Sequence, residues 1–250
     1  MSKIPKSKPQ QSPADTAKLL AHYGVKDKVS LVAVRGYYRN TLSGGKNGRG
    51  DFDDALFLVA PECHVAFNGN TDPSSYRKGS GRGSAKGMAS LKSGLWRAHK
   101  IGLHKGQYTA LVQTAGPVTV IRDGSPNYED TGHFGINIHR GGVNTTSSLG
   151  CQTIPPAQWE AFIALVKSKL KEHGQKVMPY LLIEEDERQA ILDIKSDITP
   201  KPADNLGPAL NLIREFEGLY LKAYLDPVNI PTIGWTTCAK LASETCIAPQ

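Results

Sequence analysis

Apolar runs along the chain predict a domain built largely from short strands. Val29–Val34 and Ala55–Val59 are continuous apolar runs bounded by turn residues, which is typical of buried strands. Tyr108–Val112 and Val118–Arg122 form a further predicted pair of strands, with Ala-Gly-Pro between them. Tyr180–Ile183 is the last strand that the pattern predicts in this region.

Two segments follow the helical period instead. Ala14–Tyr23 predicts a short helix in which Asp15 is placed to cap and Gly24 ends the helix. Pro155–Glu172 predicts a longer amphipathic helix that ends before Gly174. Its apolar stripe consists of Trp159, Phe162, Ile163 and Val166.

Changes in composition suggest four segments. Residues 1–13 contain almost nothing apolar and are expected to be a disordered tail. Residues 14–187 form the predicted domain, and residues 188–205 have the acidic, proline-bearing composition of a linker. A new helical pattern opens at residue 206 and continues into the segment 206–250. The predicted fold class is α+β, with a mostly-β N-terminal domain, one strong amphipathic helix, and a helix followed by a hairpin at the C-terminus.

The positive charge is concentrated in the first part of the chain. Residues 1–110 hold 18 lysines and arginines against 7 acidic residues, whereas residues 111–250 hold 12 against 16. This imbalance indicates an anionic partner, or else only a solubilising surface. The basic residues are not interleaved with aromatic ones and no nucleic-acid motif is present, so we do not expect nucleic acid as the partner. The oligomeric state is left open.

The chain shows no targeting or membrane-spanning segment. Its N-terminus has no apolar core of the kind found in signal peptides, and no run approaches the roughly 18 apolar residues that span a bilayer. We therefore expect synthesis in the cytoplasm and no stable membrane insertion. The four cysteines, Cys63, Cys151, Cys238 and Cys246, match no zinc or disulfide spacing and are expected to be free thiols. No cofactor is indicated.

The C-terminal segment predicts a helix that leads into a hairpin. Leu210, Ile213 and Phe216 form an apolar stripe that ends at Gly218. Two strands are then predicted, Leu219–Leu225 and Pro231–Trp235, with an Asp-Pro-Val-Asn turn cluster between them.

Three polar positions of this segment have a distinctive spacing. Glu217-Gly218 is followed nine residues later by Asp226, and six residues after that by Thr232-Ile233-Gly234. The segment resembles the N-terminal part of the phage-type lysozymes. The resemblance implies a muramidase that hydrolyses the bond between MurNAc and GlcNAc in peptidoglycan, with Glu217 as acid, Asp226 as base, and Thr232 holding the attacking water with Asp226.

Two plainer interpretations of this segment remain open. Taken singly, Glu217 and Asp226 are ordinary surface charges of a helix and a hairpin. The chain also ends at Gln250, before the helical lobe that the resemblance implies, so an incomplete lysozyme-like segment is expected, and an inactive fragment is one reading of it.

A second constellation lies in the N-terminal domain. Ile136 and Ile138 alternate with polar residues, so His139 ends a predicted strand, and a loop rich in small residues leads from it to Cys151. A histidine and a cysteine brought together by such a loop form a base and a nucleophile. The sequence Ser148-Leu149-Gly150-Cys151 resembles the L,D-transpeptidase signature, although Thr153 stands where that family has arginine.

This constellation leaves several functions open. The resemblance implies a cysteine transpeptidase or peptidase that acts on the peptides of the cell wall. A lone buried cysteine is, however, more often part of a core. Two further alternatives are a non-catalytic domain that binds peptidoglycan and a metal site. The ligands available for a metal are His99, His104, His133, His139 and Cys151, but no ligand spacing supports one.

Overall fold

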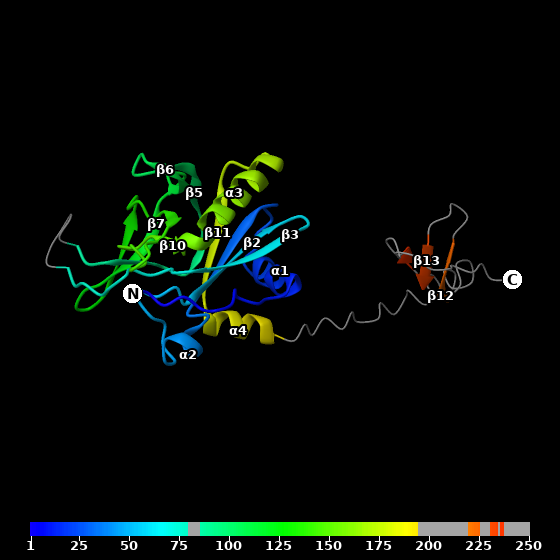
Figure 1. Ribbon diagram of the computed structural model, residues 1–250, viewed down its shortest axis with the longest axis horizontal. Coiled ribbons are helices and arrows are strands. Elements are labelled where there is room, and N and C mark those ends of the chain that lie inside the picture. The colour runs from blue at the N-terminus through cyan, green and yellow to red at the C-terminus, as the bar shows by residue number, and fades with distance from the viewer. Residues whose placement is uncertain (80–85, 195–219, 226–230, 235, 238–250) are drawn as a thin grey trace. The chain divides into compact units, whose positions relative to one another are not determined.

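The computed structural model describes residues 1–79, 86–194, 220–225, 231–234 and 236–237, the last three ranges by their backbone alone (Figure 1). The chain divides into two compact units, Met1–Ile194 and Lys195–Gln250. Within the described residues, no helix has the length and apolar character needed to cross a membrane.

An eight-stranded sheet dominates the first unit, with the strand order β10-β9-β6-β5-β11-β1-β2-β3. The backbone of Asn70, next to the β3 edge, pairs with Thr153 on the opposite edge strand through two hydrogen bonds of 2.8 Å, so the sheet closes on itself. Its strands are β1 (Ser30–Arg35), β2 (Asp54–Ala60), β3 (Cys63–Gly69), β5 (Gly94–His104), β6 (Tyr108–Gln113), β9 (Ile138–Arg140), β10 (Gln152–Ile154) and β11 (Met178–Glu184).

Among its described residues, this unit also has a smaller sheet and four helices. The smaller sheet has the order β4-β7-β8 and consists of β4 (Ala89–Leu91), β7 (Val118–Arg122) and β8 (Tyr128–Gly132). The helices are α1 (Pro13–His22), α2 (Arg39–Leu42), α3 (Pro156–Glu172) and α4 (Glu185–Asp193).

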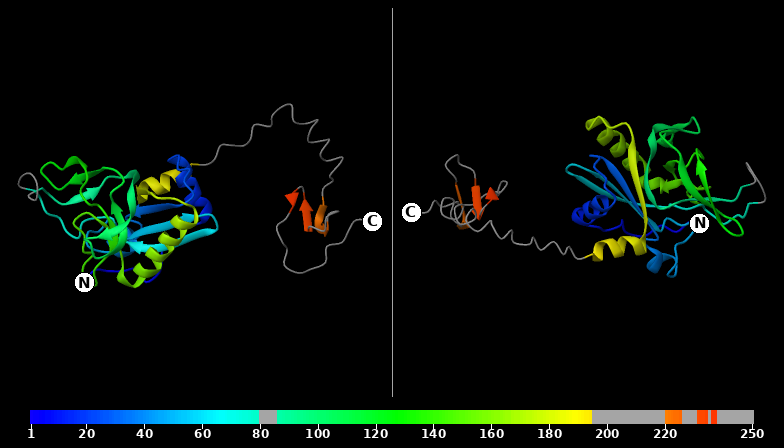
Figure 2. Two further views of the ribbon diagram at one scale, coloured as in Figure 1. Left: turned by 90° about the horizontal axis from the view of Figure 1, so that it is seen from above. Right: turned by 180° about the vertical axis from the view of Figure 1, so that it is seen from behind.

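The middle residues of the central strands are apolar because helices cover both faces of the sheet. In β1, Leu31 and Ala33 belong to one core cluster, whereas Val32 and Val34 belong to another. Helix α3 contributes side chains to the first cluster. Helices α1 and α4 contribute side chains to the second, from the other side of the strands (Figures 1 and 2). Continuous apolar runs are the expected pattern for strands that are buried on two faces.

The predicted fold class is wrong. We expected an α+β fold, but the structure is mostly β, with one nearly closed eight-stranded sheet, a three-stranded sheet in the same unit, and few helices. It is not a lysozyme-like helical fold. The apolar pattern located several strands but did not show how they pair, and closure of the sheet depends on Asn70 and Thr153, two polar residues far apart in the sequence.

Strand pairing also corrects a second expectation. The predicted strands Tyr108–Val112 and Val118–Arg122 exist as β6 and β7, but they belong to different sheets. Strand β6 pairs with β5, and β7 pairs with β4 and β8. The two strands are close in sequence, yet each pairs with strands elsewhere in the chain.

The helix predictions agree closely with the structure. Helix α3 spans Pro156–Glu172 and buries Trp159, Phe162, Ile163 and Val166, as the stripe predicted. Helix α1 begins at Pro13, and its cap is Ser12, whose hydroxyl accepts a hydrogen bond from the backbone N–H of Asp15 at 3.0 Å. The expected capping role of Asp15 is therefore wrong by three positions.

The N-terminal segment, for which we expected disorder, makes specific contacts in the structure. The backbone N–H of Ser2 donates to the carbonyl of Asn144 at 3.0 Å, and that of Phe52 donates to the carbonyl of Lys3 at 2.9 Å. The amide of Asn68 donates to the carbonyl of Ser7 at 3.1 Å. These contacts use the backbone of the segment, which composition alone does not reveal.

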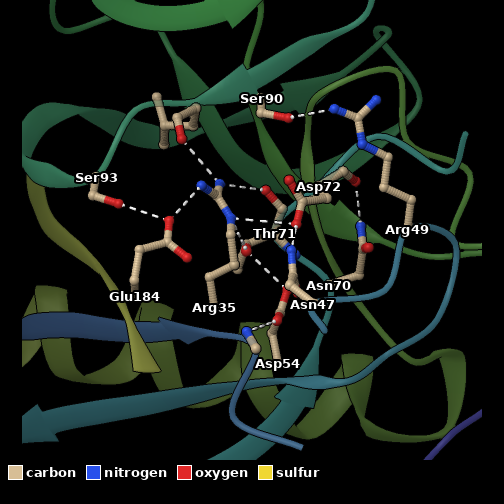
Figure 3. A network of polar contacts seen from close by, with 12 residues as sticks. Arg35, Asn47, Arg49, Asp54, Asn70, Thr71, Asp72, Ser90, Ser93 and Glu184 are labelled. Atoms are coloured by element: carbon tan, nitrogen blue, oxygen red, sulfur yellow. Dashed lines mark hydrogen bonds and ion pairs between the residues drawn. The ribbon is translucent and has the colours of Figure 1, made fainter. Parts of the chain in front are cut away.

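A buried ionic network ties the two sheets together (Figure 3). The guanidinium of Arg35, at the end of β1, donates to the carbonyls of Thr71 and Leu91, both at 2.9 Å. Its Nε lies 3.3 Å from Oδ2 of Asp72, and its Nη1 lies 3.0 Å from Oε1 of Glu184. Because Leu91 belongs to β4, this one side chain joins the large sheet to the small one.

In the second unit, the described backbone is a short antiparallel sheet of β12 (Tyr220–Leu225), β13 (Pro231–Gly234) and β14 (Thr236–Thr237). Strand β12 pairs with β13, with Tyr224 opposite Thr232. The hairpin predicted from the sequence is therefore confirmed in its two strands.

Candidate functional site

The three residues predicted from the lysozyme resemblance lie mostly outside the described structure. Glu217 and Asp226 are not among the described residues. Thr232 lies in β13, where only the backbone is described. The second predicted set, His139 and Cys151, lies in the well-described first unit, and it can be built from its strands upward.

Neighbouring strands place His139 and Cys151 on the same side of the sheet. Strands β9 and β10 are parallel, and Thr153 is the register partner of His139. The backbone N–H of Gln152 donates to the carbonyl of Asn137 at 2.8 Å, which extends the ladder toward Cys151. Side chains alternate along an extended backbone, and Cys151 lies directly before β10, so we infer that it points to the same face as Thr153 and His139.

One ring nitrogen of His139 is fixed by a backbone contact. Its Nδ1 lies 2.8 Å from the carbonyl oxygen of Arg140, and a carbonyl oxygen can only accept a hydrogen bond. Nδ1 therefore carries the proton, and in the neutral ring Nε2 holds the free lone pair. Burial lowers the pKa of His139 from 6.5 to about 4, so the ring is neutral at pH 7.

The thiol of Cys151 is half-buried and protonated at rest. Burial raises its pKa, while a backbone hydrogen bond from Asn137 and the charge of Lys105 oppose that rise. The thiol donates to the carbonyl of Gly135 at 3.3 Å. Among the described hydrogen bonds, none joins Cys151 to His139.

Three residues that the sequence did not assign to a thiol–histidine site surround the pair. The hydroxyl of Tyr108 lies 3.4 Å from Nδ1 of His139, and the ring of His104 stacks on that of His139 with centroids 4.1 Å apart. The positive charge of Lys105 lowers the pKa of His139 and of Cys151. These residues come from β5, β6 and the turn between them, and no local sequence pattern links them to Cys151.

Backbone constraints fix the approach to the thiol. Gly150, directly before Cys151, has a φ of +145°, and a Cβ there would lie 2.3 Å from the carbonyl oxygen of Ala89. Only glycine fits such a conformation and such a close contact. The thiol faces a cavity of about 240 Å³ that Gly135 and Gly150 also line, so a small group can reach the sulfur.

The residues considered as metal ligands are separated or have other partners. His104 Nδ1 lies 3.1 Å from the side-chain amide of Asn137, and His99 Nε2 donates to the carbonyl of Ile136 at 2.8 Å. Within the part of the chain that the structure describes, no three His, Cys, Asp or Glu side chains converge as metal ligands would.

Comparison with known protein families, with curated proteins and with solved structures finds no match for this chain. The candidate site therefore depends on the geometry around Cys151 and His139.

Proposed function

We propose that the first unit is a cysteine acyltransferase that acts on the peptide part of peptidoglycan, as a transpeptidase or a peptidase. The observation that carries this proposal is the combination of a thiol facing a cavity and a histidine on the same face of the adjoining strand. That histidine is held neutral, with Nε2 as its basic nitrogen. Such a pair is the minimal apparatus of nucleophilic catalysis.

The chemistry uses the two side chains in turn. Nε2 of His139 accepts the thiol proton as the sulfur of Cys151 attacks the carbonyl carbon of a peptide bond. The C–N bond then breaks, and the imidazolium returns the proton to the leaving amine. A thioester remains on Cys151, and a second amine or a water molecule displaces it.

The resting protonation states define the first step. At pH 7 the imidazole of His139 is neutral and the thiol of Cys151 is protonated, so the sulfur has to give its proton to Nε2 before or during its attack. The absence of a direct contact between the pair in the described hydrogen bonds is compatible with this role, because catalytic hydrogen bonds often tighten only when substrate binds.

The cell wall is proposed as the target on two separate grounds. The Ser148-Leu149-Gly150-Cys151 sequence resembles that of enzymes acting on wall peptides, and the polar spacing in the second unit resembles that of enzymes acting on wall glycans. Both resemblances imply the same polymer, so the substrate is supported more broadly than the reaction.

Trapping of the thioester tests the proposal. Purified stem peptides incubated with the protein should add an acyl mass to Cys151, seen by mass spectrometry of the intact chain and its peptides. The adduct should disappear in Cys151→Ala and form more slowly in His139→Gln. Cys63→Ala is the matched control, because Cys63 lies in β3, outside this site. An adduct that persists in Cys151→Ala, or a rate unchanged in His139→Gln, would refute the proposal.

A second function, hydrolysis of the glycan, is proposed for the C-terminal unit. The spacing of Glu217, Asp226 and Thr232 supports it, because it resembles that of the phage-type lysozymes. New reducing ends released from purified sacculi should be lost in Glu217→Gln and kept in Cys151→Ala. Binding to sacculi with neither product would indicate a non-catalytic wall-binding protein instead.

A further inference from the structure

The cavity beside Cys151 is lined by several positively charged side chains. Three cationic side chains line it together with the thiol: Arg77, Lys86 and Arg122. They come from the segment before β4 and from β7, which are remote in sequence from the loop that carries Cys151. The rest of the lining is apolar or backbone and consists of Gly87, Met88, Ala89, Phe134, Gly135, Ile136, Leu149 and Gly150.

Two of these three cations, Lys86 and Arg122, share a single carboxylate. Lys86 Nζ lies 2.6 Å and Arg122 Nε 3.1 Å from the same oxygen of Asp130. The pKa of Asp130 is lowered by its hydrogen bonds with Lys86 and Arg122, so it is ionised and neutralises one charge of the group. The cavity therefore keeps an excess of about two positive charges next to the sulfur.

Arg77 is the cation with the most freedom to bind a ligand. Among the described contacts, its guanidinium reaches only the sulfur of Met88, at 3.9 Å, and no carboxylate. The nearby carboxylate of Asp123 is already engaged, because it accepts from Arg49 at 2.6 and 2.8 Å. A guanidinium without a carboxylate partner at the wall of a small cavity is suited to bind an anion through two hydrogen bonds.

We propose that this cavity binds a free carboxylate of the acyl donor, so that the protein selects peptides with an acidic group within one residue of the scissile bond. Arg77, assisted by Arg122 and Lys86, is the specificity-determining side chain. The inference rests on the proposed acyl transfer at Cys151. A substrate with its carboxylate amidated would leave the cations unpaired and is expected to react roughly 10-fold more slowly.

The charge of the cavity can be tested without turnover. Iodoacetate and iodoacetamide alkylate a thiol by the same reaction, in which a sulfur–carbon bond forms and iodide leaves, but only iodoacetate carries a carboxylate. Site-resolved mass spectrometry gives both rates at Cys151 and at Cys63 in the same sample, so Cys63 serves as an internal reference.

We expect the iodoacetate-to-iodoacetamide rate ratio to be roughly 10-fold higher at Cys151 than at Cys63, and to fall as salt is added. In Arg77→Gln the ratio at Cys151 should drop toward that of Cys63. Arg122→Gln provides a second variant, and Arg97→Gln a matched control, because Arg97 pairs with Asp27 and does not line the cavity. Equal ratios at the two cysteines, or a ratio unaffected by Arg77→Gln, would overturn the inference.

The outcome separates this inference from the proposed function. A thioester on Cys151 with no preference for the anionic reagent would leave acyl transfer standing and reject the carboxylate pocket. A clear preference that Arg77→Gln abolishes, without any thioester, would establish an anion-binding cavity and reject acyl transfer.

Discussion

Replacing Arg35 by leucine should strongly destabilise the first unit. The side chain is almost fully buried and donates four hydrogen bonds, two to backbone carbonyls and one each to the hydroxyl of Thr71 and the carboxylate of Glu184. Leucine fills part of the volume but supplies no donor. The partners in Figure 3 would therefore lose the positive charge around which they are arranged.

The loss in free energy of unfolding depends on which partners of Arg35 water can reach. Glu184 is 44% exposed and can be solvated, whereas Asp72 is only 5% exposed. Asp54, whose carboxylate accepts from the backbone of Gly36 and Thr71, is fully buried nearby. Removing one partner of a buried ion pair costs about 3–5 kcal/mol, because the other charge stays buried. That is a large share of the ~5–15 kcal/mol by which domains are stable.

Urea unfolding of the full chain, followed by circular dichroism, measures this loss. Arg97→Leu is the control, because its pair with Asp27 is on the surface, with side chains 48% and 24% exposed. Such a pair contributes at most about 1 kcal/mol. If Arg35→Leu lowered the free energy of unfolding no more than Arg97→Leu does, the view that Arg35 holds the two sheets together would be wrong.

Three further predictions test other parts of the first unit. Gly150→Ala should slow alkylation of Cys151 by iodoacetamide, since the new Cβ would lie 2.3 Å from the Ala89 carbonyl and displace the loop; an unchanged rate would show that the loop adapts freely. Trp159→Ala should cost about 3–5 kcal/mol in urea unfolding, because the indole is 2% exposed in the larger core; a loss below ~1 kcal/mol would contradict that packing. Burial lowers the pKa of His99 from 6.5 to about 4, so its contribution to stability is complete above pH 6.5 and is lost as the pH falls from 6.5 to about 4, at roughly 1.4 kcal/mol per pH unit. His99→Gln should make the acid dependence of unfolding shallower, and identical slopes would contradict this assignment.

Prediction from sequence succeeded where the spacing of apolar residues within one element was enough to define it. The stripe of Trp159, Phe162, Ile163 and Val166 has the period of a helix that is buried on one side, and α3 lies within two residues of its predicted bounds. It failed for the fold class, because closure of the sheet and the assignment of β6 and β7 to different sheets depend on partners far away in the chain. The local pattern of a strand does not indicate which distant strand pairs with it.

The candidate site was predicted in the same partial way. His139 and Cys151 were singled out as candidates because a short loop joins them and the surrounding residues resemble a known pattern. Tyr108 and His104 reach the site only through the pairing of β5, β6 and β9. Arg77 reaches it through the smaller sheet and its preceding segment. None of these three has a local feature that sets it apart from other polar residues.

The sequence by itself determined which residues could form buried strands, where the long helix begins and ends, and which nucleophile and base deserved a test. These properties depend on side-chain chemistry and on short-range spacing. Only the tertiary structure decided that the large sheet closes through Asn70 and Thr153, that Arg35 is buried between two sheets, and that Cys151 lines one cavity with three cationic side chains. Those features arise from the free energy of bringing distant segments together, which no local stretch of sequence encodes alone.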